Sequence, residues 1–356
     1  MTVPVESVGA VVAPTARALF DDRLRRYRDV TIAGLLSYVP RREPATHLYD
    51  LVPDYPTRPG KGLRPALCIA TCRAFGGRVE QVLLSAIAIE CFHNAFLVHD
   101  DVEDGSEHRR GRPTMHAAEG VPIAVNVGDA LNVLSIRPLM DNLAAIGPRL
   151  TWLVFAEIEH MVRQSVEGQA IELGWVRDNV VDLEIEEYLR MTLKKTCWYT
   201  CMHPVRIGAI VATKGRIDPA RFDRFAYFMG AAFQIQDDLL NLRGVEKVYG
   251  KEILGDLWEG KRTVMLLHLL KALRGADRDR LVTFLRLPRR ERHGEDVEWV
   301  RDQMERHGSF DFAAAVAHGL ATAARAEFDV AYAGATGTDD LEMLQTLVTY
   351  MIEREV

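Results

Sequence analysis

Residues 79–104 read VEQVLLSAIAIECFHNAFLVHDDVED, a long apolar segment that ends in a run of acidic residues. Apolar residues would lie on nearly every side of a helix formed by this segment, so we expect a buried central helix. Residues 225–242, FAYFMGAAFQIQDDLLNL, combine a second long apolar stretch with an acid pair. These two segments are therefore predicted to form both the core and one end of a candidate site.

The rest of the chain is also predicted to be helical. From Thr15 onward, apolar residues recur at spacings of three and four with charged residues between them. Alternating β-branched runs, Asn-Gly turns and tandem repeats are missing from the sequence. Residues 1–15 are expected to form a loosely ordered tail, and residues 286–309 a solvated peripheral loop and helix. We predict an all-α fold, a single large helical bundle around a central cavity, over residues 16–356.

Composition and charge exclude several classes of protein. The formal net charge of −6 leaves no broad basic field for a nucleic-acid backbone. No apolar run approaches the ~18 uncharged residues that would cross a bilayer, and the N-terminus lacks the basic start of a secretory signal. The cysteine count is odd and no Cys-x-x-Cys pair occurs, so we expect reduced, mostly buried thiols in a cytoplasmic protein. The cysteines are Cys68, Cys72, Cys91, Cys197 and Cys201.

The first acidic run contains Asp100, Asp101, Glu103 and Asp104. Asp100 and Asp104 are four residues apart, so they share one face of the predicted helix. Like charges at that spacing destabilise an exposed helix by roughly 0.2–0.5 kcal/mol, and the cost should be larger where the helix is buried. A divalent cation would turn this repulsion into ligation, because Mg²⁺ binds carboxylate oxygens together with water and phosphate oxygens.

The second run contains Asp237, Asp238 and Asn241, of which the first and the last share a helix face. Asn241 can offer an oxygen to a metal but contributes no charge. A solvated helix end or a cap would also explain either run by itself. Two runs facing each other across a cavity would form a Mg²⁺-loaded mouth above an apolar tunnel. That geometry suits a ligand with a polyphosphate head and a hydrocarbon tail.

Basic residues in Gly- and Pro-containing segments accompany both acidic runs. They occur in GKGLRP (60–65), HRRGRP (108–113), KKT (194–196) and GKEILGDLWEGKRT (250–263). Each of these cations alone would be interpreted as a solvated surface group. Around two metal-type clusters, they are predicted to clamp a diphosphate.

Six segments occur in the order found in trans-prenyl diphosphate synthases: GKGLRP, HDDVEDGSEHRRGRPTMH, GQAIEL, KKT, FQIQDDLLN and GKEILGDLWEGKRT. The chain therefore resembles the polyprenyl synthetase family, and geranylgeranyl diphosphate synthases most of all. The resemblance implies the isoprenoid synthase fold and a prenyltransferase that condenses isopentenyl diphosphate with an allylic diphosphate. Ionisation, condensation and deprotonation would follow one another. It also implies Mg²⁺ as the cofactor, with three ions around the bound diphosphate, and a homodimer.

The resemblance also implies roles for individual residues. The implied metal-binding residues are Asp100, Asp104, Asp237, Asp238 and Asn241, with Asp101 in support and Asp256 as an outer carboxylate. The residues implied to hold the allylic diphosphate are Arg109, Lys195, Lys251 and Lys261. The implied pocket for isopentenyl diphosphate contains Lys61, Arg64, His93 and Arg110, and the residues lining the reacting carbons are Thr196, Phe233 and Gln234.

The sequence departs from the family's usual motifs at two positions, and two other positions bear on the length of the product. Asn241 replaces the usual last Asp of the second acidic motif, and Glu172 stands where the family commonly has Asp. The resemblance implies that Ala95 and Phe96 form the floor of the tunnel. A small residue at 95 should allow growth past C15, while Phe96 should still limit it, so we expect a C20 product. The alternative is that both side chains simply pack in the core.

Two other functions stay open at this stage. A class I terpene cyclase on the same scaffold would need both metal clusters but not the isopentenyl pocket formed by Lys61, Arg64, His93 and Arg110. A non-catalytic partner subunit of a prenyl synthase should have lost one acidic cluster or its clamps, and this sequence has both. The sequence has no Gly-x-Ser-x-Gly nucleophile elbow, and it has no zinc-type spacing or dinucleotide fingerprint.

Overall fold

The computed structural model describes residues 16–243 and 253–352. Over these residues the chain is helical almost throughout, and the only sheet among them is a two-stranded ribbon. The predicted all-α fold is therefore confirmed. The predicted tail, residues 1–15, lies outside the described residues, as does Lys251.

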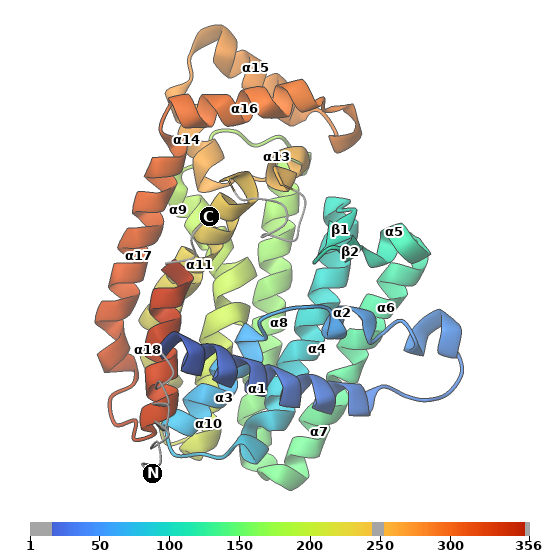
Figure 1. Ribbon diagram of the computed structural model, residues 1–356, viewed down its shortest axis with the longest axis vertical. Coiled ribbons are helices and arrows are strands. Elements are labelled where there is room, and N and C mark those ends of the chain that lie inside the picture. The colour runs from blue at the N-terminus through green and yellow to red at the C-terminus, as the bar shows by residue number, and fades with distance from the viewer. Residues whose placement is uncertain (1–15, 244–252, 353–356) are drawn as a thin grey trace, which may run out of the picture.

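The first half of the chain forms the elements on one side of the molecule and most of its centre (Figure 1). These elements are α1 (Ala16–Tyr38), η1 (Ala45–Tyr49), α2 (Asp54–Thr57), α3 (Leu63–Ala74), α4 (Val79–Asp104), β1 (His108–Arg109), β2 (Arg112–Pro113), α5 (Met115–Glu119), α6 (Val121–Leu134), α7 (Ile136–Ala145) and α8 (Pro148–Arg177).

The second half of the chain completes the bundle and covers one end of it. Its elements are α9 (Ile185–Thr192), η2 (Leu193–Met202), α10 (His203–Ala212), η3 (Pro219–Phe222), α11 (Asp223–Arg243), α13 (Gly255–Glu259), α14 (Val264–Ala272), α15 (Gly275–Arg286), η4 (Arg289–Glu291), α16 (Gly294–Arg306), α17 (Ser309–Ala331) and α18 (Thr338–Ile352).

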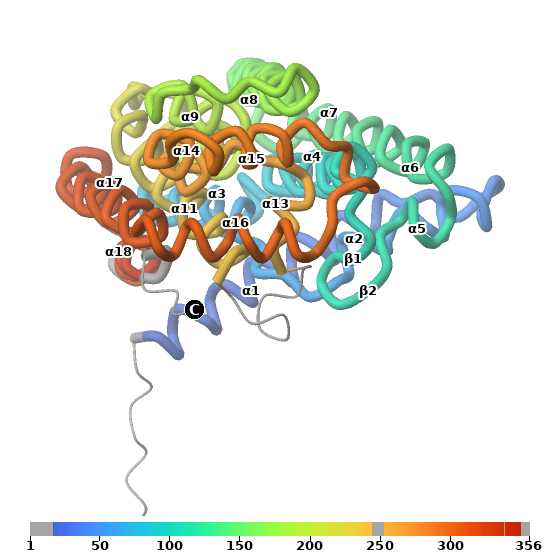
Figure 2. Tube along the Cα trace, turned by 90° about the horizontal axis from the view of Figure 1, so that it is seen from above, coloured from blue at the N-terminus to red at the C-terminus, as the bar shows by residue number. Residues whose placement is uncertain are grey.

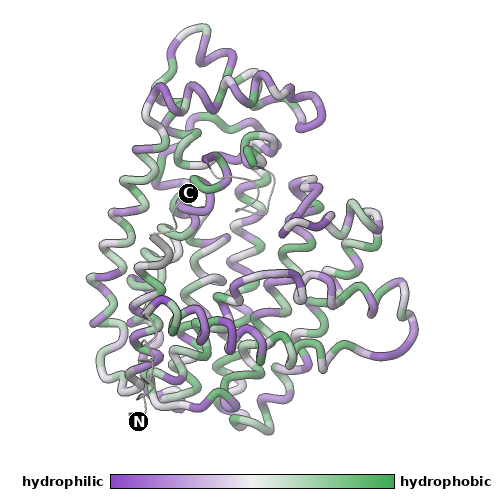
Figure 3. The backbone as a smooth tube through the Cα atoms, in the orientation of Figure 1, coloured by the Kyte–Doolittle hydropathy of each residue, from purple (hydrophilic) through white to green (hydrophobic). Residues whose placement is uncertain are grey.

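The central helices are α3, α4, α10 and α11, together with η2. α4 packs against α3 and α6, and η2 packs against α8 and α11. Seen from above, α17 and α18 lie at one side of the molecule and α6 and α7 at the opposite side (Figure 2). The central segments are mostly hydrophobic, whereas α15 and α16 at the end of the bundle carry many hydrophilic residues (Figure 3).

α4 is the buried central helix that the sequence predicts. Thirteen of its residues are buried, and it ends at Gly105, whose left-handed φ of 64° is typical of a helix C-cap. By length and composition alone, this helix is also long and apolar enough to cross a membrane. However, 67% of its most apolar window is buried inside the protein, as in the core helix of a globular domain.

η2 is a π-helical segment that carries the Lys-Lys-Thr motif. π-Helical segments are rare in proteins, and the short ones are found frequently at functional sites. Gly168 of α8 leaves room for the backbone of η2, because a Cβ there would lie 2.3 Å from the backbone nitrogen of Lys195. The glycine of the GQAIEL segment therefore allows α8 and η2 to approach closely, which brings Lys195 against α8.

The β1–β2 ribbon follows α4 directly and turns through Arg110 and Gly111. Both residues have left-handed φ values, 55° and 74°, as a tight two-residue hairpin requires. Arg109 and Arg110 both line the central cavity. The turn thus returns two cations to the end of the helix that carries the first acidic run.

Candidate active site

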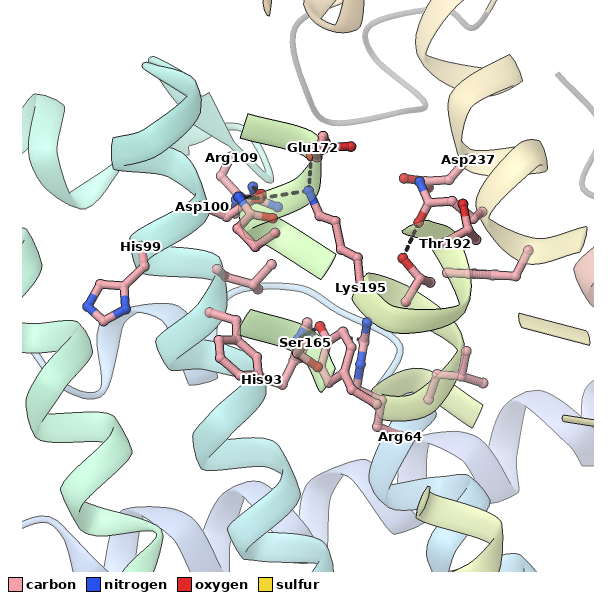
Figure 4. A pocket seen from close by; sticks show the side chains of 18 of the residues that line it. Arg64, His93, His99, Asp100, Arg109, Ser165, Glu172, Thr192, Lys195 and Asp237 are labelled. Carbon is pink, nitrogen blue, oxygen red and sulfur yellow. Dashed lines mark hydrogen bonds and ion pairs between the residues drawn. The ribbon is translucent and has the colours of Figure 1, made fainter. Parts of the chain in front are cut away.

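One cavity of about 920 Å³ opens between α4, α8, η2 and α11. Figure 4 shows Asp100 and Asp237 on opposite sides of it, with Lys195 between them. Most of the residues predicted for the site line this cavity: Lys61, Arg64, His93, Phe96, Asp100, Arg109, Arg110, Lys195, Thr196, Phe233, Gln234, Asp237, Asp238 and Lys261, with Asp256 beside them. Ala95, Asp101, Asp104 and Asn241 do not line it.

Asp100 projects from the end of α4 toward three donors. Its carboxylate lies 3.3 Å from an Nη2 of Arg109 and 3.5 Å from Nζ of Lys195, and Gln169 donates to it at 3.4 Å. Gln169 also donates to Glu103 at 2.6 Å. Sequence reasoning did not single out Gln169, although it stands in the quoted GQAIEL segment.

Asp101 points away from the cavity and is 1% exposed. Its carboxylate accepts from Nε of Arg109 at 2.7 Å and from the hydroxyl of Tyr55 at 2.5 Å. Tyr55 is fixed in turn by the backbone N–H of Met115, at 3.1 Å. Asp101 is therefore placed to orient the Arg109 guanidinium and not to contact a ligand itself.

Asp104 faces a neighbouring cavity of about 630 Å³, which shares Glu103, Glu172 and Lys261 with the central one. Its carboxylate lies 2.8 Å from Nζ of Lys261, and burial raises its pKa. Lys261 is also 2.7 Å from Glu259. Glu259 directly precedes Gly260-Lys261 and was missed from the sequence, although an acid adjacent to a predicted clamp residue was an available signal.

Two lysines lie among several carboxylates of the site and offset part of their charge. Lys261 lies among Asp104, Glu259 and Asp256, the last at 3.9 Å, and Lys195 bonds to Glu172. Burial alone would lower the pKa of each lysine, but the surrounding carboxylates raise both pKa values above their ordinary range. Both ammonium groups are therefore charged at neutral pH.

Of the three residues of the second acidic run, Asp237 and Asp238 line the cavity and Asn241 does not. Asp238 is 6% exposed and accepts from the Tyr188 hydroxyl at 2.8 Å and from the Gln234 amide at 2.7 Å, while Gln234 accepts from Thr196 at 2.8 Å. Burial raises the pKa of Asp238 to about 7. Each oxygen of Asp238 accepts one hydrogen bond from a neutral donor and keeps a second lone pair, so direct metal binding by Asp238 stays a prediction.

Asn241, which was also predicted as a metal ligand, differs from Asp237 and Asp238 in that it does not line the cavity. Its side-chain oxygen accepts the backbone N–H of Asp256 at 3.0 Å, and the residue is 4% exposed. The amide is turned toward the start of α13 and away from the mouth of the cavity. Burial of the helix end, which the sequence pattern does not reveal, accounts for this difference.

A second group of cations lies deeper in the cavity. The Arg64 guanidinium lies 3.3 Å from Nε2 of His93, donates to Thr200 at 2.8 Å and stacks 4.1 Å over the Tyr199 ring. Tyr199 in turn lies 2.7 Å from Nδ1 of His93. The Arg110 guanidinium reaches the same region, because Gly60 has no Cβ to obstruct it.

An acidic residue that was not predicted for the site, Glu90, lies beside these deeper cations. It is 6% exposed and lines the cavity. Burial raises its pKa, while Arg64 and Arg110 act in the opposite direction. An isolated acid within the apolar stretch of α4 was the signal available in the sequence.

The two predicted floor residues lie in different surroundings. Phe96 lines the cavity, stacks on Phe92 and meets the Tyr199 ring edge-on at 5.5 Å. Ala95 is fully buried in a separate cluster between α4 and α6, with Val98 and other apolar residues. One residue along the helix turns the side chain by about 100°, which explains why neighbours face different sides.

The side chains of the site supply only some of the ligands that a divalent metal needs. Among residues 16–243 and 253–352, no three His, Cys, Asp or Glu side chains converge closely enough to hold a metal. The donors that line or border the cavity are carboxylates, which suit Mg²⁺, an ion that usually keeps water and phosphate oxygens among its ligands. A diphosphate bound between the acidic runs would supply the missing oxygens.

Comparison with known proteins finds a matching family model and similar relatives. Residues 45–304 match the family model described as Polyprenyl synthetase. A geranylgeranyl diphosphate synthase of Saccharolobus solfataricus is 31% identical over 252 residues, which cover 70% of this chain and 74% of that protein.

Two crystal structures are similar over nearly the whole chain. One is a geranylgeranyl pyrophosphate synthetase from Pyrococcus horikoshii, 28% identical, covering 95% of this chain and 99% of that one with a TM-score of 0.82. The other is a polyprenyl synthase from Caulobacter crescentus complexed with calcium and isoprenyl diphosphate. It is 26% identical and covers 94% of this chain and 98% of that one, with a TM-score of 0.80.

Proposed function

Because the chain belongs to the polyprenyl synthetase family, we propose that it condenses isopentenyl diphosphate with an allylic diphosphate and releases diphosphate. The observation that carries this proposal is a single cavity with Asp100 and Asp237 on opposite sides and a separate group of cations deeper within it. One end suits an ionising diphosphate and the other a second diphosphate that stays intact.

We assign Asp100, Asp104, Asp237 and Asp256 as the residues that hold Mg²⁺. Three ions are proposed around the bound diphosphate, and the calcium-containing structure from Caulobacter crescentus supports a divalent metal. Bound there, Mg²⁺ would act as a Lewis acid that stabilises the charge of the departing diphosphate. Asp101 and Asn241 take supporting positions, and Asp238, which also lines the cavity, stays a predicted ligand.

Arg109, Lys195 and Lys261 are proposed to hold the allylic diphosphate, and Lys251 joins them by resemblance alone. Asp101 contacts both Nε and Nη2 of Arg109, at 2.7 and 2.6 Å, and so holds Nη2 3.3 Å from Asp100 at the mouth. The two lysines would exchange their carboxylate partners for phosphate oxygens. Such fixed cations stabilise the leaving group without any protein nucleophile.

Lys61, Arg64, His93 and Arg110 are proposed to bind isopentenyl diphosphate. Stacking on Tyr199 and the bond to Thr200 fix the Arg64 guanidinium before the substrate arrives. The double bond then attacks the allylic cation, and the proton is lost to the released diphosphate. Thr196, Phe233 and Gln234 line the space where these carbons would meet, and exclusion of water protects the cation.

The product is proposed to be geranylgeranyl diphosphate, with 20 carbons. Phe96 lines the cavity one helical turn below Asp100, where it can stop a growing tail. The names of the relatives from Saccharolobus solfataricus and Pyrococcus horikoshii support the same length. Any effect of Ala95 on length would be indirect, because it lies behind the lining.

We also propose a cytoplasmic homodimer whose single catalytic domain spans residues 16–356. Exposed large apolar side chains gather on α6, α7 and α8, and a patch of this kind marks an interface. They are Val121, Val125, Val133, Ile136, Met140, Leu143, Trp152, Phe155 and Val166.

The proposed cytoplasmic location is supported by the cysteines. All five are buried and free, which suits a reducing compartment.

Incubation with Mg²⁺, isopentenyl diphosphate and each allylic diphosphate in turn tests the proposal, with the products identified by mass. A longer diphosphate is expected, and its length after a start from farnesyl diphosphate decides the C20 assignment. A hydrocarbon product would point to a terpene cyclase, and no product to a partner subunit. The variant R64A tests the assignment of the two diphosphate sites, because it should raise KM for isopentenyl diphosphate more than KM for the allylic substrate.

A further inference from the structure

Asn241 holds the chain at two points where it returns to the cavity. Its backbone carbonyl accepts the N–H of Leu254 at 2.9 Å, and its side-chain oxygen accepts the N–H of Asp256 at 3.0 Å. The intervening turn is tight, with Leu254 in the left-handed region at φ 64°, and a Cβ on Gly255 would lie 3.4 Å from Nδ2 of Asn241. The end of α11 and the start of α13 therefore form one packed unit.

This unit carries charged groups of the site. Asp256 lines the cavity, and its backbone carbonyl accepts the N–H of Lys261 at 2.9 Å. Glu259, between them, contacts the Lys261 ammonium at 2.7 Å. Whatever fixes the backbone at 256 therefore also fixes the positions from which these three side chains project.

We propose that Asn241 is a positioning residue for Asp256 and not a metal ligand. This inference rests on the proposed function only in that Asp256 takes part in binding metal and diphosphate. An amide is suited to the task because it accepts the backbone hydrogen bond without adding a charge. An aspartate would place one more buried carboxylate next to Asp256, in a region that already contains Asp237 and Asp238.

Two measurements separate positioning from ligation, and neither requires prenyl transfer. The first is amide hydrogen exchange over residues 254–259 in the ligand-free protein, and the second is calorimetric binding of inorganic pyrophosphate in the presence of Mg²⁺. N241A should increase exchange at Asp256 roughly tenfold and weaken pyrophosphate binding about three- to tenfold, as expected for loss of one buried hydrogen bond. N241D can accept the same N–H and should keep the protection.

D256N is the matched control, because it removes the carboxylate and leaves the backbone turn in place. It should weaken pyrophosphate binding while exchange over 254–259 stays as in the unmodified protein. Weaker binding in N241A with unchanged exchange would identify Asn241 as a ligand and overturn the proposal, and so would loss of protection in N241D. If the unmodified protein bound no pyrophosphate, the proposed function would fail, while the exchange comparison would still decide whether Asn241 fixes Asp256. A thermal unfolding scan establishes that each variant is folded.

Discussion

Replacing Tyr188 with Phe removes one of the donors that stabilise the buried Asp238 carboxylate. The hydroxyl donates at 2.8 Å, and burial has already raised the pKa of Asp238 to about 7. Without this donor the pKa should rise further. The folded pKa lies above the unfolded value, so the contribution of Asp238 to stability is full at low pH and decreases as pH rises through the folded pKa. Y188F should deepen that decrease.

The size of the effect follows from the charge state of Asp238. Near pH 5.5 the carboxyl is protonated and the variant should lose a neutral hydrogen bond, about 0.5–1.5 kcal/mol. Near pH 8.5 the carboxylate is charged and the loss should be about 1.5–3 kcal/mol. Urea unfolding at both pH values measures the difference between Y188F and the unmodified protein.

Y332F is a suitable control because the Tyr332 hydroxyl is buried but pairs with a neutral group, Thr71, at 2.9 Å. Its cost should be about 0.5–1.5 kcal/mol and the same at both pH values. If Y188F were equally destabilising at low and high pH, Asp238 would not be the group through which Tyr188 acts, and the reasoning would be refuted.

Three further predictions concern the cavity and the apolar face. F96A should lengthen the product by at least one five-carbon unit, which mass analysis measures, and an unchanged product would contradict this prediction. A95F should mainly destabilise the fold through overpacking, by about 1–3 kcal/mol in urea unfolding. K261A leaves buried carboxylates without their counter-charge and should destabilise the protein by about 3–5 kcal/mol. Mg²⁺ should restore part of that loss in thermal unfolding, and no response to Mg²⁺ would count against a metal at these carboxylates. F155E should shift sedimentation from dimer to monomer, while V330E, which changes an exposed apolar residue outside the proposed interface, should not.

The sequence predicts the central helices and the cavity well because both depend on local patterns. The apolar stretches of α4 and α11 are long enough to leave only a buried helix as a reasonable interpretation. In both segments the acidic residues directly follow the apolar stretch, so they are predicted to lie near the helix end. Asp100 and Asp237 do line one cavity. Spacing along each helix predicts which residues share a face, and the order of the six motifs predicts that the two helix ends meet.

The directions of individual side chains could not be predicted in the same way. Asp101 differs from Asp100 by one position, yet it is buried against Tyr55 and Arg109. Asn241 bonds to a backbone group fifteen residues away, and the close approach of η2 to α8 depends on the missing side chain of Gly168. Each of these features is set by packing between distant segments, which motif spacing does not encode.

The ion pairs between lysines and carboxylates affect the order in which a metal ion and a diphosphate can bind. Nζ of Lys195 and Nζ of Lys261 already supply positive charge beside Asp100 and Asp104, so a bare ion must compete with both. A pyrophosphate group relieves this competition by drawing the ammonium groups toward itself. Ion and anion should therefore each enhance the affinity for the other, and by the reciprocity of linked equilibria the enhancement must be the same in both directions.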